Sequence, residues 1–188
     1  MRLKTTLSEP IVSSFLSCEK DTETILRKLF VDSQPHSDML KKLLVVQSRD
    51  VLDKNYNVSD YNLKRLLDEK YIVISPKAEI EEPDQIKSFI TINFDNFITN
   101  QTNPEFRDCM IYIDIACHFD QWELGDYRLR PYKIMGIIDG ILNKSHLSGI
   151  GSLTFVGGHQ QELVIPHWSV HTLQYLAIHG SDDKISNE

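Results

Sequence analysis

The side chains that most often catalyse reactions or bind metals are histidine and cysteine, and their spacing here supports neither role. His167 and His171 are four residues apart, which on a helix would bring both rings to one metal ion. The apolar and β-branched residues around them indicate a strand instead, in which four residues span about 13 Å. Cys117 and His118 are adjacent, so in a strand their side chains point to opposite faces. We therefore predict no metal site.

The patterns of nucleophilic and phosphate-binding enzymes are also missing. The sequence contains no Gly-x-Ser-x-Gly turn, and Gly149 and Gly151 lack the third glycine and the following helix of a phosphate-binding loop. Cys109 and Cys117 fall on an apolar face, where a thiol usually serves as a small buried side chain. We expect no catalytic residues and no cofactor, and so no enzyme.

Acidic side chains gather in one short loop, which contains Glu79, Glu81, Glu82 and Asp84. No base or metal-ligating side chain accompanies them in the sequence. Connecting loops run over protein surfaces and often carry binding residues. We expect these carboxylates to face solvent, a partner protein or a channel.

Length and composition are those of an ordinary globular domain. The chain has 188 residues, of which 41% are hydrophobic and 25% charged, enough to bury one core. A formal net charge of −7 argues against a protein that wraps nucleic acid with its whole surface. Three cysteines are too few for a disulfide framework, and neither a membrane span nor the apolar stretch of a signal peptide is found. We expect a soluble, reduced protein of the cytoplasm with no membrane contact.

The first third of the chain has the periodicity of helices. We predict a first helix with Asp21 and Thr22 as its N-terminal caps. A second helix is predicted from about 38 to 53, with Ser37 as its N-cap, and a short third helix begins at Ser59 or Asp60. These helices form a predicted N-terminal helical region, residues 1–70, that packs on the core.

The periodicity then changes from helical to alternating. Strands are predicted at 71–75, 88–97, 109–119, 152–156 and 167–178, with a helix at about 128–144 and a hairpin turn at Gly157–Gly158. This order predicts an α+β fold, a mainly antiparallel sheet with a long helix packed on one face. The core would span residues 71–180, followed by a flexible tail at 181–188.

The strand at 109–119 has the clearest pattern. Cys109, Ile111, Ile113, Ile115, Cys117 and Phe119 share one apolar face, which we expect to pack on the core. The other face is mixed, so we expect Tyr112, Asp114 and His118 to meet water or another subunit. Arg128 and Arg130 begin the following helix as a small positive patch, suited to salt bridges or to carboxylates of another protein.

The second half of the chain resembles phage neck and tail-completion proteins. The stretch Asn103 to Trp122 resembles their central strand, and Arg128 to Leu142 looks like their long helix. The segments from Gly151 to Val164 and from His167 to His179 look like their closing strands. The resemblance covers about residues 88–179 and concerns the order and character of the elements.

That family comprises tail terminators of long-tailed phages and related head–tail joining proteins. The resemblance implies a virion structural protein of the neck, a ring-forming subunit, usually hexameric, that caps the tail tube and joins it to the head connector. Its partners would be further copies of itself, the tail tube protein and connector or neck proteins, with DNA only as passing cargo. Such a protein is assembled in the host cytoplasm and resides in the virion.

Other readings remain open. Within the same class, the chain could be a head-completion or connector subunit; from other classes, an enzyme with an unrecognised site or a regulatory small-ligand domain. An enzyme would show polar side chains converging in one pocket, whereas a ring subunit would show a large, partly apolar contact surface. The predicted subunit or partner interface consists of Tyr112, Asp114, His118, Glu79, Glu81, Glu82, Asp84, Arg128 and Arg130.

Overall fold

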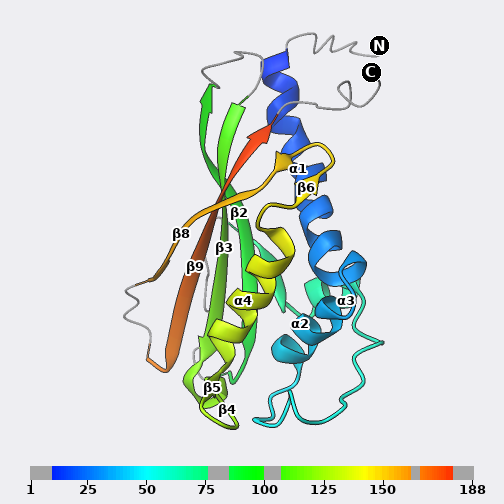
Figure 1. Ribbon diagram of the computed structural model, residues 1–188, viewed down its shortest axis with the longest axis vertical. Coiled ribbons are helices and arrows are strands. Elements are labelled where there is room, and N and C mark those ends of the chain that lie inside the picture. The colour runs from blue at the N-terminus through cyan, green and yellow to red at the C-terminus, as the bar shows by residue number, and fades with distance from the viewer. Residues whose placement is uncertain (1–9, 76–84, 100–106, 162–165, 180–188) are drawn as a thin grey trace.

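The computed structural model describes residues 10–75, 85–99, 107–161 and 166–179, in which helices gather on one face of a five-stranded sheet (Figure 1). The helices are α1 (Pro10–Arg27), α2 (His36–Val45), α3 (Leu63–Asp68) and α4 (Arg130–Leu142), with a π-helical turn at Lys28–Asp32 and a 3₁₀ turn at Phe119–Gln121. The large sheet contains β1 (Ile72–Ile74), β2 (Ser88–Thr99), β3 (Arg107–His118), β8 (Thr154–Gln160) and β9 (Trp168–His179). Two small hairpins complete the fold, β4 (Glu123–Leu124) with β5 (Arg128–Leu129) and β6 (His146–Leu147) with β7 (Gly151–Ser152).

The large sheet is almost entirely antiparallel. Its strand order is β1-β2-β3-β9-β8, and only the short β1 runs parallel to its neighbour β2. Each antiparallel neighbour of β3 pairs with it along most of its length, so β3 is the central strand. The α+β fold predicted from the sequence is confirmed.

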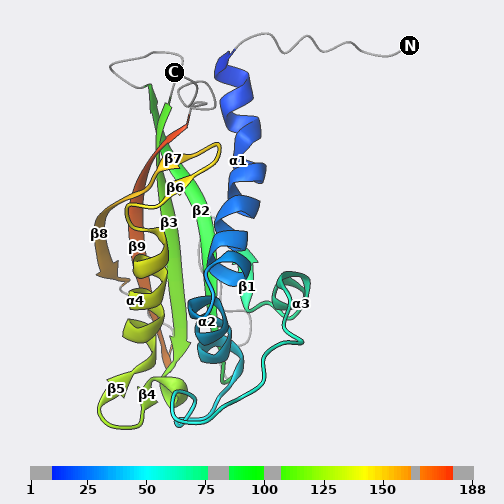
Figure 2. The same cartoon turned by 45° about the vertical axis from the view of Figure 1, so that its right-hand side comes forward.

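One hydrophobic core joins the helices to the sheet. Cys109, Ile111, Ile113, Ile115 and Cys117 of β3 are fully buried on the helix-covered face, as their alternation predicted. The same prediction was wrong for Phe119, which is half exposed because β3 ends at His118 and Phe119 begins a 3₁₀ turn. Figure 2 shows α1, α2 and α4 on that same side. The helical side of the core is supplied by Ile25, Leu29, Phe30, Leu40, Leu43, Leu44, Ile134 and Ile138. The N-terminal helices therefore share a core with the sheet, while the domain division at residue 70 stays a prediction.

The first two helices differ from their predicted limits. Helix α1 begins at Pro10, and Asp21 and Thr22, the predicted caps, lie buried inside it. Proline is tolerated in the first turn because its missing N–H has no helical partner there, and the Thr22 hydroxyl donates to the Cys18 carbonyl within the helix. Helix α2 ends at Val45, well before the predicted limit at residue 53.

The predicted hairpin turn at Gly157–Gly158 is wrong. Both glycines lie inside β8, which continues to Gln160 past a register shift against β9 between Phe155 and Gly157. A β-carbon on Gly158 would lie 3.1 Å from the backbone oxygen of Thr172. Glycine therefore allows β8 and β9 to lie close together at this position. The predicted tail at 181–188 lies outside the described residues.

The Arg130 side chain is fully buried, and its hydrogen bonds within the described ranges all go to backbone carbonyls. Its Nε donates to the Gln121 carbonyl at 2.8 Å, and its two terminal nitrogens donate to Leu43, Val46 and Ser48 carbonyls at 2.6–3.0 Å. Those carbonyls include the C-terminal end of α2, where the helix dipole favours a cation. Arg130 therefore does not contribute to a surface patch, which corrects the sequence interpretation.

A helix of the described residues that is long and apolar enough to cross a lipid bilayer is not found.

Replacing Arg130 tests this contact. Arg130→Met would leave four carbonyls without their donor, so we expect the free energy of unfolding to fall by about 3 kcal/mol. Urea denaturation measures the loss. The matched control is Arg128→Met at the partly exposed neighbouring arginine, where we expect a clearly smaller loss because an exposed ion pair contributes little. Equal losses in the two variants would contradict the assignment.

Candidate interaction site

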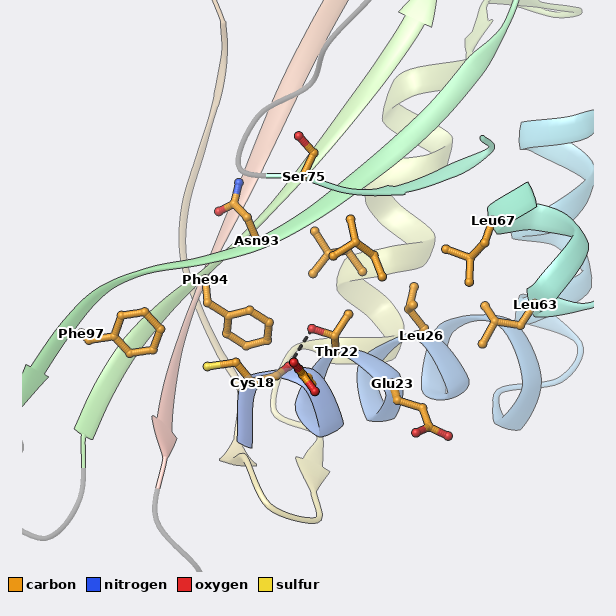
Figure 3. Close-up of a pocket in the computed structure, with 13 residues that line it drawn as sticks. Cys18, Thr22, Glu23, Leu26, Leu63, Leu67, Ser75, Asn93, Phe94 and Phe97 are labelled. Carbon is orange, nitrogen blue, oxygen red and sulfur yellow. Dashed lines mark hydrogen bonds between the residues drawn. The ribbon is translucent and has the colours of Figure 1, made fainter. Parts of the chain in front are cut away.

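An open groove of about 570 Å³ lies beside α1 (Figure 3). We call it the α1 groove. Cys18, Thr22 and Leu26, spaced four apart, form its helical wall because that spacing puts them on one face of α1. The remaining lining comes from Glu19, Glu23, Leu63, Leu67, Ile74, Ser75, Ile92, Asn93, Phe94 and Phe97, on α1, α3, the end of β1, and β2.

The surface of the α1 groove is largely apolar. Leu26 and Ile92 are buried at its base, Phe94 and Phe97 are half-buried, and Ile74 is 60% exposed at the end of β1. Figure 3 shows Phe94 and Leu26 facing the same space from opposite sides, β2 and α1. Apolar side chains that line a concavity and remain in contact with water are typical of a binding surface.

Two carboxylates belong to the lining. Glu19 and Glu23 lie one turn apart on α1 and are exposed. Within the described ranges neither forms an ion pair or a side-chain hydrogen bond. A ligand that carries cations beside apolar groups would match both the lining and its charge.

The polar side chains that line the α1 groove include a hydroxyl and a thiol. The Thr22 hydroxyl is already used, since it donates to the Cys18 carbonyl at 2.7 Å (dashed in Figure 3). Burial and the nearby Asp21 raise the pKa of the Cys18 thiol, so the thiol is neutral near pH 7. In the described part of the chain, groups of three or more His, Cys, Asp or Glu placed to hold a metal are not found.

Asp114, one of the predicted interface residues, lies within the protein. It is 3% exposed on the sheet face opposite the helices. Its carboxylate accepts hydrogen bonds from the Thr172 hydroxyl at 2.6 Å, the Gln161 amide at 3.0 Å and the Thr91 hydroxyl at 3.1 Å. Because β3 is the central strand, neighbours on β2 and β9 flank this side chain on both sides and satisfy it.

His118 is similarly enclosed, at 5% exposed. Its Nδ1 accepts a hydrogen bond from the Asp120 backbone N–H, and its ring packs against Trp168 and His167. Tyr112 is the partly exposed member of the predicted trio, and its hydroxyl accepts a hydrogen bond from the Asn96 side chain at 2.9 Å.

Arg128 forms a salt bridge within the chain. Its guanidinium donates to the Asp53 carboxylate and to the Gly125 carbonyl, both at 2.7 Å. The bond from Arg128 lowers the pKa of Asp53. Of the two roles expected for this arginine, the salt bridge is the one observed. The acidic cluster Glu79, Glu81, Glu82 and Asp84 lies outside the described residues.

Sequence reasoning missed the α1 groove because it started the first helix too late. With the helix beginning at Pro10, Cys18, Thr22 and Leu26 form one face, and this spacing was readable in the sequence. The juxtaposition of that face with Phe94 and Phe97 depends on tertiary packing and had no local signal.

A second cluster contains an unsatisfied histidine. His171 of β9 is 3% exposed and packs against the rings of Trp122 and Tyr132 at 5.6 and 5.3 Å between centroids. Its Nε2 has no hydrogen-bond partner among the described residues. Burial lowers the pKa of His171 below its ordinary value, so the folded protein favours the neutral ring.

Comparison with known proteins identifies the family. The described residues form an α+β fold with an open, largely apolar groove beside α1. A family model described as YomW matches residues 37–175, about three-quarters of the sequence, and the chain therefore belongs to the YomW family. The match runs from α2 into β9 and leaves out α1.

Among solved structures, the fold is similar to a chain in a structure titled "Virion of native gene transfer agent (GTA) particle". The TM-score is 0.41 at 10% sequence identity, covering 65% of this chain and 89% of that one. A TM-score of this size supports no functional argument. None of the curated proteins compared matches the sequence.

We expect the buried His171 to make the stability of the fold depend on pH. Because the pKa of His171 is lower in the folded chain than its ordinary 6.5, its contribution to stability is present above that value and is lost as the pH falls below it. We expect the urea midpoint of the wild type to fall more than that of His171→Phe between about pH 7.5 and 5.5. Parallel pH profiles for the two proteins would contradict the assignment.

The three thiols should differ in reactivity. Cys109 and Cys117 are buried, and burial raises the pKa of Cys117 to about 11, whereas Cys18 is half-buried at the α1 groove. We expect a bulky maleimide to label one thiol quickly in the native protein. Peptide mapping by mass spectrometry should place that label on Cys18, and Cys18→Ser should abolish the fast phase. Fast labelling at Cys109 or Cys117 would show that the core is open.

Proposed function

We propose that the protein is a structural component of a phage-type virion, and specifically a ring-forming tail terminator of the neck. In this role it caps the tail tube and joins it to the head connector. It acts by binding other proteins and not by catalysis.

The observation that carries the proposal is the arrangement of the core from β2 to β9. Long antiparallel strands β2, β3 and β9 are present with α4 packed on one face, in the order on which the sequence resemblance to neck and tail-completion proteins rests. Membership of the YomW family, which is phage-derived, supports the broader virion role.

The exposed apolar surfaces suit a subunit that contacts copies of itself. Figure 1 shows the β4–β5 hairpin at one end of the molecule. Besides the α1 groove, exposed aromatic side chains belong to residues in and around this hairpin. There Phe119 and Tyr132 are each half exposed against Trp122, and Tyr127 is fully exposed. One subunit could use one of these apolar surfaces to contact the other surface of its neighbour, which is a head-to-tail contact. Such contacts form a closed ring when the rotation between neighbouring subunits brings the last subunit back to the first.

The charge of the chain also suits a channel. A net charge of −7 gives little attraction to phosphate, so DNA would pass through the ring without sticking.

Native mass tests the ring directly. Six copies of 21.7 kDa give about 130 kDa, which light scattering distinguishes easily from a monomer over a range of concentrations. We expect this species either for the protein alone or after addition of purified tail tubes. A monomer under both conditions would overturn the proposal.

A further inference from the structure

We propose that the α1 groove binds a basic amphipathic helix of a partner protein, one that carries Lys or Arg side chains beside its apolar face. The proposal does not depend on the ring, because it concerns a single subunit and a single partner segment.

Three apolar side chains of the lining keep exposed surface that a partner can cover. Ile74 at the end of β1 is 60% exposed, and Leu63 and Leu67 on α3 are half-buried. The two leucines are four residues apart, so they lie one turn apart on the same face of α3. Figure 3 shows both side chains pointing from α3 toward α1. Covering these side chains removes apolar surface from water and supplies the affinity for an apolar partner face.

The charged side chains of the lining are both acidic. Glu19 and Glu23 are exposed and lie one turn, about 6 Å, apart along α1. Lys20 and Arg27, exposed cations of the same helix, do not line the groove. Exposed ion pairs add little affinity, but they favour a basic partner over an acidic one.

The apolar lining favours a helix over an extended strand. A strand would bring backbone N–H and C=O groups that need hydrogen-bond partners, whereas a helix satisfies these groups internally. The Thr22 hydroxyl, one of the polar groups of the lining, already donates to the Cys18 carbonyl. Helices that lay an apolar face into a groove are a recurrent mode of peptide recognition. Lys or Arg side chains one turn apart on such a helix match the spacing of Glu19 and Glu23.

Synthetic peptides test the chemistry of the partner. The probe is an amphipathic Leu/Lys helix of about 18 residues, or five turns, labelled for fluorescence anisotropy at low ionic strength. We expect it to bind at least about tenfold more tightly than a Leu/Glu helix of the same pattern, and than a Leu/Lys peptide whose scrambled order has no apolar face. No binding, or equal binding of the ordered and scrambled Leu/Lys peptides, would overturn the proposal, because general attraction to an acidic protein needs no groove.

Charge reversal places the binding in the groove. We expect Glu19→Lys with Glu23→Lys to make the protein prefer the Leu/Glu helix. The matched control is Asp120→Lys with Asp126→Lys, the same change of net charge at exposed carboxylates outside the lining, which should leave the preference for the Leu/Lys helix. Equal effects of the two double variants would overturn the assignment to the groove.

The apolar contact has its own test. We expect Ile74→Ser to weaken binding of the Leu/Lys helix at least about fivefold, because the peptide covers the exposed part of this side chain. Val156→Ser, at a side chain of similar exposure on β8, is the control and should bind as the wild type does. Circular dichroism should show an unchanged fold for both. Unchanged binding of Ile74→Ser would overturn the apolar half of the proposal.

Discussion

The Arg130 guanidinium lies where three parts of the chain meet, and the relative positions of helices and sheet depend on it. It begins α4, bonds to the Gln121 carbonyl just after β3, and reaches one carbonyl in the last turn of α2 and two that follow it. A buried cation without a carboxylate partner is costly unless many oxygen atoms surround it. Here four backbone carbonyls surround the guanidinium. The Arg130 N–H groups in turn supply hydrogen bonds to carbonyls at the buried end of α2, which have no partner within the helix. The end of α2 and the start of α4 are thus fixed together.

The helices cover the sheet unevenly around this junction. With α1, α2 and α4 packed on one face of the sheet, the core between them is closed. Helix α3 has six residues and β1 three, and among the described residues an open groove lies between them, α1 and β2. This is the α1 groove. At the other end, the β4–β5 hairpin leaves aromatic rings exposed beside α4.

Local patterns in the sequence predicted the parts of the fold that depend on neighbours along the chain. The alternation of apolar residues predicted the buried face of β3. Successive side chains of a strand point to opposite faces, so when one face of the sheet is covered by helices the apolar set must lie on that face. It could not show that Asp114 on the other face is satisfied by Thr91 and Thr172, because those partners lie on different strands. Arg130 was misplaced for the same reason, since an arginine at a helix start looks like surface charge until its tertiary carbonyl partners are known. Gly157 and Gly158 suggested a turn, whereas they permit close approach of β8 to β9. The α1 groove required both the true start of α1 and its packing against β2.

The central claim is our proposal that this chain is the subunit of a ring. Single-particle cryo-electron microscopy of the assembled protein, alone or on tail tubes, tests it most directly. The account predicts a closed ring of copies of this chain. Isolated subunits in both samples would contradict the ring.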